Sequence, residues 1–196
     1  MNRDIDFLFE LGQLRYIKRA WVQVLCPDFE NLSEHMFRVI WLALLISKME
    51  NAGDHEKIMK MALAHDIVES RTGDVHYISR QYTKRNEELA IADMVEDTSL
   101  TEFKDIWNEY EKRESIEAKI VKDADNLSVD MELVEQAYRG NQLKEVFSEH
   151  RHKVASSGLT TESAKKLWHQ IWNGNPHDWH LKGRNRFNGG DWKEYK

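Results

Sequence analysis

The sequence predicts an all-α protein, and three observations support this prediction. Only two prolines and nine glycines interrupt 196 residues, which favours a few long helices over many short strands. Apolar residues recur three or four positions apart in several segments, which is the spacing of an amphipathic helix. The regular alternation of apolar and polar residues that is typical of half-buried strands is missing, and the sequence shows no internal repeat. We therefore expect one helical domain of about eight helices.

The first two predicted helices are separated by a loop. Residues 4–19 carry apolar side chains three positions apart and are predicted to form an amphipathic helix. Residues 22–32 include Pro27 and are expected to form the loop. Ser33 can cap a second helix, which extends to about Asn51. Because this helix is apolar on nearly all sides, we expect it to lie buried at the centre of the domain.

Six further helices are expected along the chain. The third is capped by Asp54 and includes His65 and Asp66 in its last turn. The fourth is expected to begin with exposed basic residues, among them Arg85, and the long sixth helix ends before a glycine. The fourth to eighth helices are predicted over residues 79–96, 101–112, 114–139, 142–156 and 161–172.

The composition changes after residue 172, which we take as the end of the domain. Residues 173–196 contain four glycines and few aliphatic side chains, and are predicted to form an irregular tail. Trp179, Phe187 and Trp192 would let this tail wrap around the domain or dock on a neighbour. A disordered tail is the alternative that the same composition allows.

Charge and hydropathy exclude several classes of protein. The formal net charge is −6 and basic residues are dispersed, so we expect no nucleic-acid partner. The longest apolar run, residues 39–46, is far shorter than the roughly 18 residues that a membrane span needs, so we expect no membrane insertion. The first residues lack the basic start and apolar middle of a signal peptide, and Cys26 is the single cysteine. These features predict a cytoplasmic protein in which Cys26 is an ordinary packing residue.

The residues with the strongest chemical signal lie between positions 63 and 74, which read LAHDIVESRTGD. His65 and Asp66 are adjacent, and an imidazole and a carboxylate can approach one metal ion from different directions. Glu69 follows one helical turn after His65 and could transfer protons beside that ion. Asp74 adds a further carboxylate directly after a glycine turn. Taken singly, Glu69 could be a solvated helix end and Asp74 an ordinary turn residue.

Two other positions could complete a metal site. His35 lies in the first turn of the apolar second helix, where a polar side chain needs a partner. Asp123 and Asp125 lie among apolar residues in the sixth predicted helix, and the helical phase does not choose between them. Two imidazoles and two carboxylates form a mixed nitrogen and oxygen set that suits Mn²⁺, Fe²⁺, Co²⁺ or Zn²⁺. A lone histidine on an apolar helix is more often a hydrogen-bonded core residue.

Three segments carry these candidates in a fixed order. The first reads LSEH and ends at His35, the second reads HDIVESRTGD and begins at His65, and the third reads EAKIVKDAD and ends at Asp125. Their order resembles that of the HD superfamily of metal-dependent phosphohydrolases. Their internal spacing is similar to that of the HD-domain 5′-deoxynucleotidases, which remove phosphate from deoxynucleoside monophosphates. The similarity extends from about residue 8 to residue 140.

The resemblance implies an all-α HD-domain bundle and a set of metal ligands. These ligands would be His35, His65, Asp66 and Asp125, so the resemblance selects Asp125 over Asp123. One divalent transition metal ion is implied, Mn²⁺, Co²⁺, Fe²⁺ or Zn²⁺, with Mg²⁺ also possible. The resemblance further implies a nucleotide substrate and a homodimer.

The resemblance also implies roles for four residues around the metal ion. Glu69 and Asp74 match the carboxylates that handle protons and position the substrate. Arg19 matches the arginine that binds the phosphate, and Trp21 matches the tryptophan that faces the nucleoside. Ala20 separates Arg19 from Trp21 here, whereas the two are adjacent in one branch of the family. Without the resemblance, Arg19 would be an ordinary cation near a helix end and Trp21 a packing residue.

Two alternatives to a 5′-deoxynucleotidase stay open at this stage. The first is another HD phosphohydrolase, acting on deoxynucleoside triphosphates, cyclic nucleotides or a non-nucleotide phosphate. The second is a non-catalytic, metal-binding helical scaffold with the aromatic tail as its binding element. Five histidines outside the three segments have no recognisable ligand spacing and are expected to lie on the surface, namely His150, His152, His169, His177 and His180.

Overall fold

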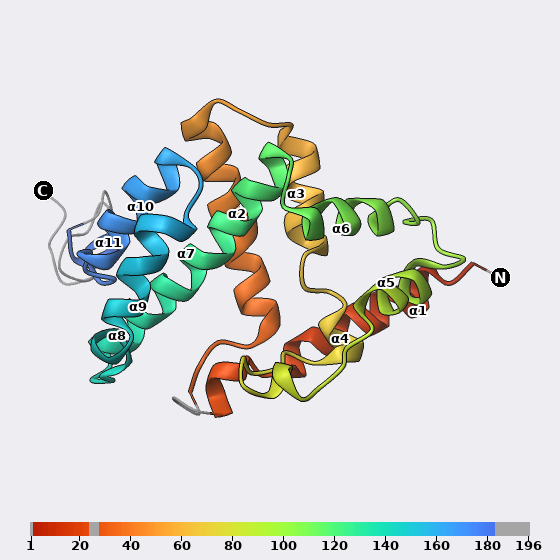
Figure 1. The fold of residues 1–196 in the computed structure, drawn as a ribbon, viewed down its shortest axis with the longest axis horizontal. Helices are drawn as coiled ribbons and strands as arrows, with labels where there is room; N and C mark the ends of the chain where they lie inside the picture. Colours follow the sequence, from red (N-terminus) through yellow and green to blue (C-terminus); the bar gives the residue numbers. More distant parts are fainter. Residues whose placement is uncertain (1, 24–27, 183–196) are drawn as a thin grey trace, which may run out of the picture.

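Two long helices form the centre of the computed structural model, which describes residues 2–23 and 28–182. Helices α2 (Leu32–Glu50) and α7 (Ile116–Tyr138) pack along one another (Figure 1). Helices α3 (His55–Ala64) and α10 (Glu162–Trp172) each pack against both. The described residues contain no strand, only an isolated bridge between Lys18 and Asn31, so the all-α prediction is confirmed. None of the helices in these residues is both long and apolar enough to span a membrane.

The apolar core has two main parts that meet near the first turn of α2. The larger part joins α2, α3, α7 and α10 and includes Val39, Met61 and Leu127. The second part joins the beginning of α2 to α1 (Asp4–Leu11), α5 (Glu87–Val95) and α6 (Phe103–Lys112). His35 and His65 are each flanked in sequence by members of the second part and are fully buried, so the fold places polar groups inside a packed interior.

Helix caps explain where the central helices begin. Asn31, not the predicted Ser33, caps α2, because its side chain accepts a hydrogen bond from the Glu34 N–H while Glu34 accepts from the Asn31 N–H. This reciprocal capping box satisfies two backbone donors at once. Asp54 caps α3 as predicted, by accepting hydrogen bonds from the N–H groups of residues 56 and 57. Ser115 and Thr161 cap α7 and α10 in the same way.

The predicted helix over residues 4–19 is wrong in its second half. Helix α1 ends at Leu11, and a 3₁₀ helix, η1 (Gly12–Tyr16), follows. The chain then becomes extended, and the Ile17 carbonyl accepts a hydrogen bond from the Leu32 N–H at 3.0 Å. Glycine lowers helix stability at position 12, and the extended segment carries Arg19 across the beginning of α2. A second 3₁₀ helix, η2 (Ala20–Gln23), closes this region.

The predicted helix over residues 79–96 is also wrong at its start. Residues 79–81 form a 3₁₀ turn, η3 (Ser79–Gln81), and α5 begins only at residue 87, with Asn86 as its cap. The intervening segment crosses the short helix α4 (Glu69–Thr72). As a result Arg85 is half-buried and paired, not exposed as predicted.

The C-terminal third is more broken than predicted. The helix expected over residues 142–156 is divided into α8 (Leu143–Val146), α9 (Ser148–Lys153) and a π-helical turn, η4 (Val154–Gly158). The tail expected to be irregular contains one helical turn, α11 (Asp178–Leu181), with Trp179 exposed. Cys26 and the tail aromatics at positions 187 and 192 lie outside the described residues, and the domain boundary at residue 172 stays a prediction.

Helix α2 is less buried than its composition predicts. Its inner face is packed in the core, but four large apolar side chains on the opposite face are exposed: Phe37, Trp41, Leu45 and Met49. An apolar pattern nearly all round a helix predicts burial by some partner, and the described part of this chain covers only one side.

Candidate functional site

Two buried imidazoles from different helices lie beside each other. His35 lies in the first turn of α2 and His65 directly follows α3, with ring centroids 5.6 Å apart. His65 Nδ1 lies 2.8 Å from the Ala62 carbonyl oxygen, so this nitrogen carries the proton and donates it. His35 Nδ1 lies 3.1 Å from Ser128 Oγ and 3.3 Å from Glu30 Oε1. Both Nε2 atoms are buried and make no hydrogen bond to any described residue.

Two carboxylates face these free Nε2 atoms. Asp66 Oδ2 lies 3.3 Å from His65 Nε2 and 3.6 Å from His35 Nε2. Asp125 Oδ1 lies 3.1 Å from His35 Nε2, while its Oδ2 accepts a hydrogen bond from Lys122 Nζ at 2.7 Å. Ligand atoms of His35, His65 and Asp66 all lie within 4.8 Å of one another, and this is the one group of that kind among residues 2–23 and 28–182. Two imidazole nitrogens that make no hydrogen bond and face two carboxylates fit a divalent metal ion.

The structure separates the two aspartates that the helical phase left undecided. Asp125 faces His35, whereas Asp123 lies two residues earlier and is turned toward the start of α10. Asp123 accepts hydrogen bonds from the Thr160 N–H, the Thr161 N–H and Thr161 Oγ1, at 2.7 to 2.9 Å. Its carboxylate is therefore used in holding α10 and is not available to the cluster.

A polar cavity of about 220 Å³ opens beside the cluster. Both acidic and basic side chains line it, together with the aromatic rings of Trp107 and Tyr110. The ring of Tyr110 packs edge-on against His65, with centroids 5.7 Å apart. The charged lining residues are Arg19, Asp66, Glu69, Asp74, Arg80, Arg85, Glu87, Glu111, Arg113, Lys122 and Asp125.

Arg19 is held in this cavity by two carboxylates. Its Nη1 lies 3.1 Å from Asp74 Oδ2 and 3.6 Å from Asp66 Oδ2, and its side chain is only 9% exposed. Asp74 Oδ2 also accepts a hydrogen bond from the Ala20 N–H at 2.9 Å, which ties the Arg19 segment to the turn after α4. Gly73 makes this turn with a backbone φ of +72°, a conformation that residues other than glycine rarely adopt.

Glu69 and Arg85 also line the cavity and contact each other. Arg85 Nη1 donates to the Gly73 carbonyl at 3.1 Å and lies 3.5 Å from Glu69 Oε1. Arg85 Nη2 lies 2.8 Å from Glu87 Oε1. Burial, aided by the charges of Asp66 and Asp74, raises the pKa of Glu69 to about 10. Without a bound cation Glu69 is therefore protonated at neutral pH.

Neighbouring charges also shift the pKa values of Asp66, Asp125 and His35, and the shifts at the two aspartates favour cation binding. Burial opposes the ionisation of Asp66, but the neighbouring His65 imidazole outweighs it and holds the pKa of Asp66 below its ordinary value. Burial is likewise outweighed at Asp125, where Lys122 and then His35 hold the pKa well below the ordinary range. For His35, burial and the charge of Arg19 act to lower the pKa, yet the nearby carboxylates of Asp125 and Glu30 raise it overall. A metal ion would displace the proton that His35 otherwise binds.

Most of the predicted site residues converge, but Trp21 does not join them. The six residues His65, Asp66, Asp125, Arg19, Glu69 and Asp74 line the cavity, and His35 lies behind it against Asp66 and Asp125. Trp21 is not among the lining residues. Its ring stacks on Phe29 and meets Phe147 edge-on, at centroid distances of 5.9 and 5.4 Å. Its role toward a nucleoside stays a prediction.

Sequence reasoning missed Arg85, Tyr110 and Glu30 as parts of this region. The segment of Arg85 resembles the start of a helix, so Arg85 is predicted to be a surface cation. Tyr110 has no motif around it that distinguishes it from the other aromatic residues. Glu30 lies directly before Asn31, the cap of α2, and no motif spacing in the sequence marks it as a site residue. The five histidines expected on the surface are all exposed, as predicted.

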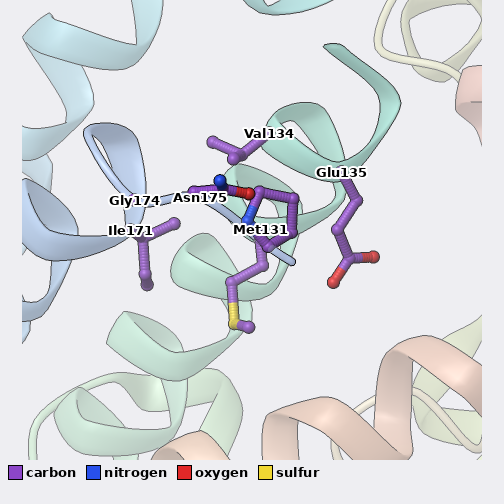
Figure 2. A pocket seen from close by; sticks show the side chains of 7 residues that line it. Met131, Val134, Glu135, Ile171, Gly174 and Asn175 are labelled. Atoms are coloured by element: carbon purple, nitrogen blue, oxygen red, sulfur yellow. The ribbon is translucent and has the colours of Figure 1, made fainter. Parts of the chain in front are cut away.

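A second cavity, of about 170 Å³, lies between the C-terminal half of α7 and the end of α10 (Figure 2). It shares no lining residue with the polar cavity. Its walls are mostly aliphatic, and Glu135 is its single charged lining residue: Met131, Val134, Glu135, Ile171, Gly174, Asn175 and Pro176. It therefore lacks the groups that hydrolytic chemistry needs.

Comparison with known proteins agrees with this geometry. The family model described as HD domain matches residues 11–168. The chain is 33% identical to 5'-deoxynucleotidase HDDC2 of Danio rerio over 151 residues, which covers 74% of this chain and 72% of the relative. A conserved hypothetical protein of Pyrococcus furiosus superposes with a TM-score of 0.70 at 25% identity, covering 86% of this chain and 98% of that one.

A third comparison shows the same fold with a metal ion bound. The cyanophage S-2L HD phosphohydrolase DatZ, bound to dA and one catalytic Zn²⁺, superposes with a TM-score of 0.54 at 20% identity. The match covers 83% of this chain and 92% of that one. With the family model matching most of the sequence and the predicted residues gathered around one cavity, the chain belongs to the HD domain family of metal-dependent phosphohydrolases.

Proposed function

We propose that this enzyme is a phosphomonoesterase that converts deoxynucleoside 5′-monophosphates into deoxynucleosides and phosphate. The observation that carries the proposal is the pair of buried Nε2 atoms, of His35 and His65, that face carboxylates without a hydrogen bond, beside a cavity that contains the buried Arg19. A metal-binding group and a buried guanidinium at one cavity suit an anionic phosphate ester. The likeness to a curated 5'-deoxynucleotidase supports the choice of substrate.

In this proposal four residues hold one divalent metal ion, namely His35, His65, Asp66 and Asp125. The bound ion would supply a positive charge that lowers the pKa of water and polarises a phosphoryl oxygen. The nitrogen and oxygen ligands suit Mn²⁺, Co²⁺, Fe²⁺ or Zn²⁺, and Mg²⁺ less well. His65 is pre-oriented for binding because its Nδ1 proton is held by the Ala62 carbonyl, which leaves the Nε2 lone pair facing the cavity.

Arg19 and Asp74 form the phosphate-binding part of the proposal. Arg19 can donate two parallel hydrogen bonds to phosphoryl oxygens, as a planar guanidinium does well. Asp74 fixes the position of Arg19 through the 3.1 Å contact and through the Ala20 N–H. A guanidinium that is already ordered loses little side-chain entropy when the substrate binds.

Glu69 is the proposed proton donor to the leaving 5′-oxygen. A carboxyl that stays protonated at neutral pH can act as a general acid, and burial gives Glu69 this property. A bound metal ion would oppose the rise in pKa, which brings Glu69 closer to the operating pH. Arg85 Nη1 lies 3.5 Å from Glu69 Oε1 and helps to hold the carboxyl in place.

A phosphate-release assay tests the proposal. The purified protein, loaded with Mn²⁺ or Co²⁺, should release orthophosphate from dAMP, dGMP, dTMP and dUMP. The Asp66→Ala variant should lose this activity, whereas His152→Ala, which changes an exposed histidine, should retain it. Full activity of the Asp66→Ala protein would show that the assigned cluster is not the catalytic site.

One observation favours a longer phosphate chain as the alternative. Arg80, Arg113 and Lys122 line the same cavity and add cations beyond Arg19. An HD phosphohydrolase acting on deoxynucleoside triphosphates would use such charges and would release triphosphate or pyrophosphate instead of orthophosphate. Product analysis by ion chromatography separates these outcomes. Cyclic or non-nucleotide phosphates, and a scaffold with no turnover, are recognised in the same screen.

We also keep a homodimer and a cytoplasmic location as parts of this proposal. The exposed aromatic side chains of α2 support association. The single cysteine in 196 residues supports a reducing compartment.

A further inference from the structure

Three guanidinium groups contact the turn of residues 73–75, which follows α4. Each of them meets a different residue of the turn: Arg19 the Asp74 carboxylate, Arg85 the Gly73 carbonyl and Arg80 the Val75 carbonyl. The Arg80 contact is a hydrogen bond of 2.8 Å that Nε donates, and the Arg80 backbone N–H donates to the His76 carbonyl at 2.9 Å. Arg80 is therefore held at its backbone and at Nε, which leaves Nη1 and Nη2 for other groups.

Arg80 differs from the other cations of the polar cavity because it has no acidic partner. Five cationic side chains line this cavity, and four of them lie close to a carboxylate. The four pairs are Arg19 with Asp74 at 3.1 Å, Arg85 with Glu87 at 2.8 Å, Arg113 with Glu111 at 3.1 Å, and Lys122 with Asp125 at 2.7 Å. Arg80 forms no ion pair with any residue that the structure describes, and its Nη atoms donate no hydrogen bond to these residues. Its positive charge is thus the one in the described lining that no carboxylate offsets.

The position of Arg80 suits a phosphoryl group. Val75, which anchors Arg80, directly follows Asp74, which anchors Arg19, so the chain places both guanidinium groups beside one turn. Both side chains line the same cavity. The two free Nη atoms form a planar fork that matches two phosphoryl oxygens, and a charged donor binds a charged acceptor most strongly.

We propose that Arg80 binds the phosphoryl group of the substrate as a second guanidinium beside Arg19. The identity of the substrate rests on the proposed function, but the binding of phosphate by Arg80 can be measured separately. Because Arg80 is exposed whereas the Arg19 side chain is buried, we expect Arg80 to capture the entering phosphate and to affect KM more than kcat. The inference also favours a single phosphate group over a triphosphate, since the other cations of the lining are already paired.

Titration of the Mn²⁺-loaded protein with orthophosphate, followed by calorimetry, tests the binding. Arg80→Gln should raise the dissociation constant about tenfold, the lower end of the range for a charged hydrogen bond, because the side chain is exposed. Arg80→Lys should lie between this variant and the wild type, because lysine keeps the charge but lacks the planar fork.

Lys84→Gln is the matched control for the loss of one positive charge. Lys84 is exposed in the same segment between α4 and α5, but it lines a different cavity. This variant should bind orthophosphate as the wild type does. The proposal would be overturned if Arg80→Gln bound orthophosphate as tightly as Lys84→Gln, or if the loaded wild-type chain bound none.

Kinetics with two substrates tests which group Arg80 contacts. Arg80→Gln should raise KM about tenfold for dAMP and equally for phenyl phosphate, which has neither sugar nor base, and kcat should change little. A higher salt concentration should reduce the difference from wild type, because exposed charges are screened. A rise in KM for dAMP alone would assign Arg80 to the nucleoside and refute the phosphate contact. If the wild-type chain hydrolysed no monoester, the proposed function would fail, and the orthophosphate titration would still decide the role of Arg80.

Discussion

The metal-binding half and the phosphate-binding half of the polar cavity are positioned in different ways. His35, His65 and Asp125 project from or directly follow α2, α3 and α7, which pack together in the larger core. Arg19 and Asp74 come from short turns, and their positions depend on a few hydrogen bonds such as Ala20 N–H to Asp74. Helix packing thus orients the proposed ligands, and local polar contacts orient the groups proposed to meet the substrate. The two halves should fail in different ways when they are altered.

The strongest test of the metal-binding half compares two aspartates on one helix. Asp125→Asn should lower kcat/KM at least about 1,000-fold, since a metal ion supplies several kcal/mol of transition-state stabilisation and about 1.4 kcal/mol is a factor of ten. Asp123→Asn should instead lower stability by about 1 to 3 kcal/mol, because it weakens the three hydrogen bonds that hold α10.

Steady-state kinetics and urea unfolding of both variants make the measurement. Metal content by elemental analysis provides the second readout, and Asp125→Asn should lose bound metal while Asp123→Asn keeps it. Loss of metal from the Asp123→Asn protein with Asp125→Asn unaffected would reverse the assignment of the two residues.

The phosphate-binding half should respond to Arg19→Gln. We expect kcat/KM to fall about 10- to 100-fold, the range for losing a charged hydrogen bond worth about 1.5 to 3 kcal/mol. The metal affinity should not fall, because the positive charge of Arg19 lies near Asp66 and repels a cation. Calorimetric titration of the variant with Mn²⁺ checks this, and weaker metal binding would mean that the two halves are not separable.

The same division explains how far the sequence could predict the site. His35 lies on the long apolar helix α2, and His65 and Asp66 directly follow the amphipathic helix α3, where period and spacing determine which side chains point inward. The choice of Asp125 over Asp123 came from resemblance. The two residues differ in that Asp123 accepts a hydrogen bond from the Thr160 N–H, 37 residues away and next to the start of α10. A tertiary partner that distant leaves no trace in local periodicity.

Two predictions failed in segments near the polar cavity, at residues 12–19 and at Arg85. Residues 12–19 kept an apolar period of three, yet they form a 3₁₀ helix and an extended segment because Ile17 pairs with Leu32 and Arg19 with Asp74. Arg85 looked like an exposed cation at a helix start, but its Nη1 meets the Gly73 carbonyl and Glu69. In both places a few long-range polar contacts override the local helix preference.

A smaller effect is expected behind the metal-binding half, at Glu30. Its buried carboxylate lies 3.3 Å from His35 Nδ1 and makes no hydrogen bond to any described residue, so its interaction with His35 is electrostatic. Glu30→Gln should weaken metal binding about tenfold, the lower range for groups that orient a ligating histidine. Glu132→Gln, which changes another buried glutamate outside contact with His35, is the control. Equal metal affinities for the two variants would assign Glu30 a purely structural role.

The metal-free protein should become less stable as the pH rises, because of Glu69. Its pKa is about 10 in the folded chain and near 4.5 when unfolded, so between these values the folded state holds a proton that the unfolded state lacks. Stability then falls with increasing pH, and the raised pKa of His35 acts in the same direction above pH 6.5. Glu69→Gln should be more stable than wild type at pH 8 and have a flatter profile of Tm against pH in the presence of a chelator. A wild-type profile that rises from pH 6 to 9 would contradict the shift.

The smallest effect on catalysis is expected from Trp21, although the family resemblance gives it a substrate-facing role. The ring is engaged with Phe29 and Phe147 and does not line the polar cavity. Trp21→Leu should therefore change kcat/KM less than about threefold, while unfolding free energy falls by about 1 to 2 kcal/mol through loss of two aromatic contacts. Phe147→Leu, which removes one of these contacts from the other side, should lower stability similarly and leave kinetics unchanged. Trp21→Leu could instead raise KM tenfold for nucleotides but not for a simple phosphate monoester. That result would mean that Trp21 moves to contact the substrate. The substrate-binding part of the cavity would then include Trp21 as well as Arg19 and Asp74.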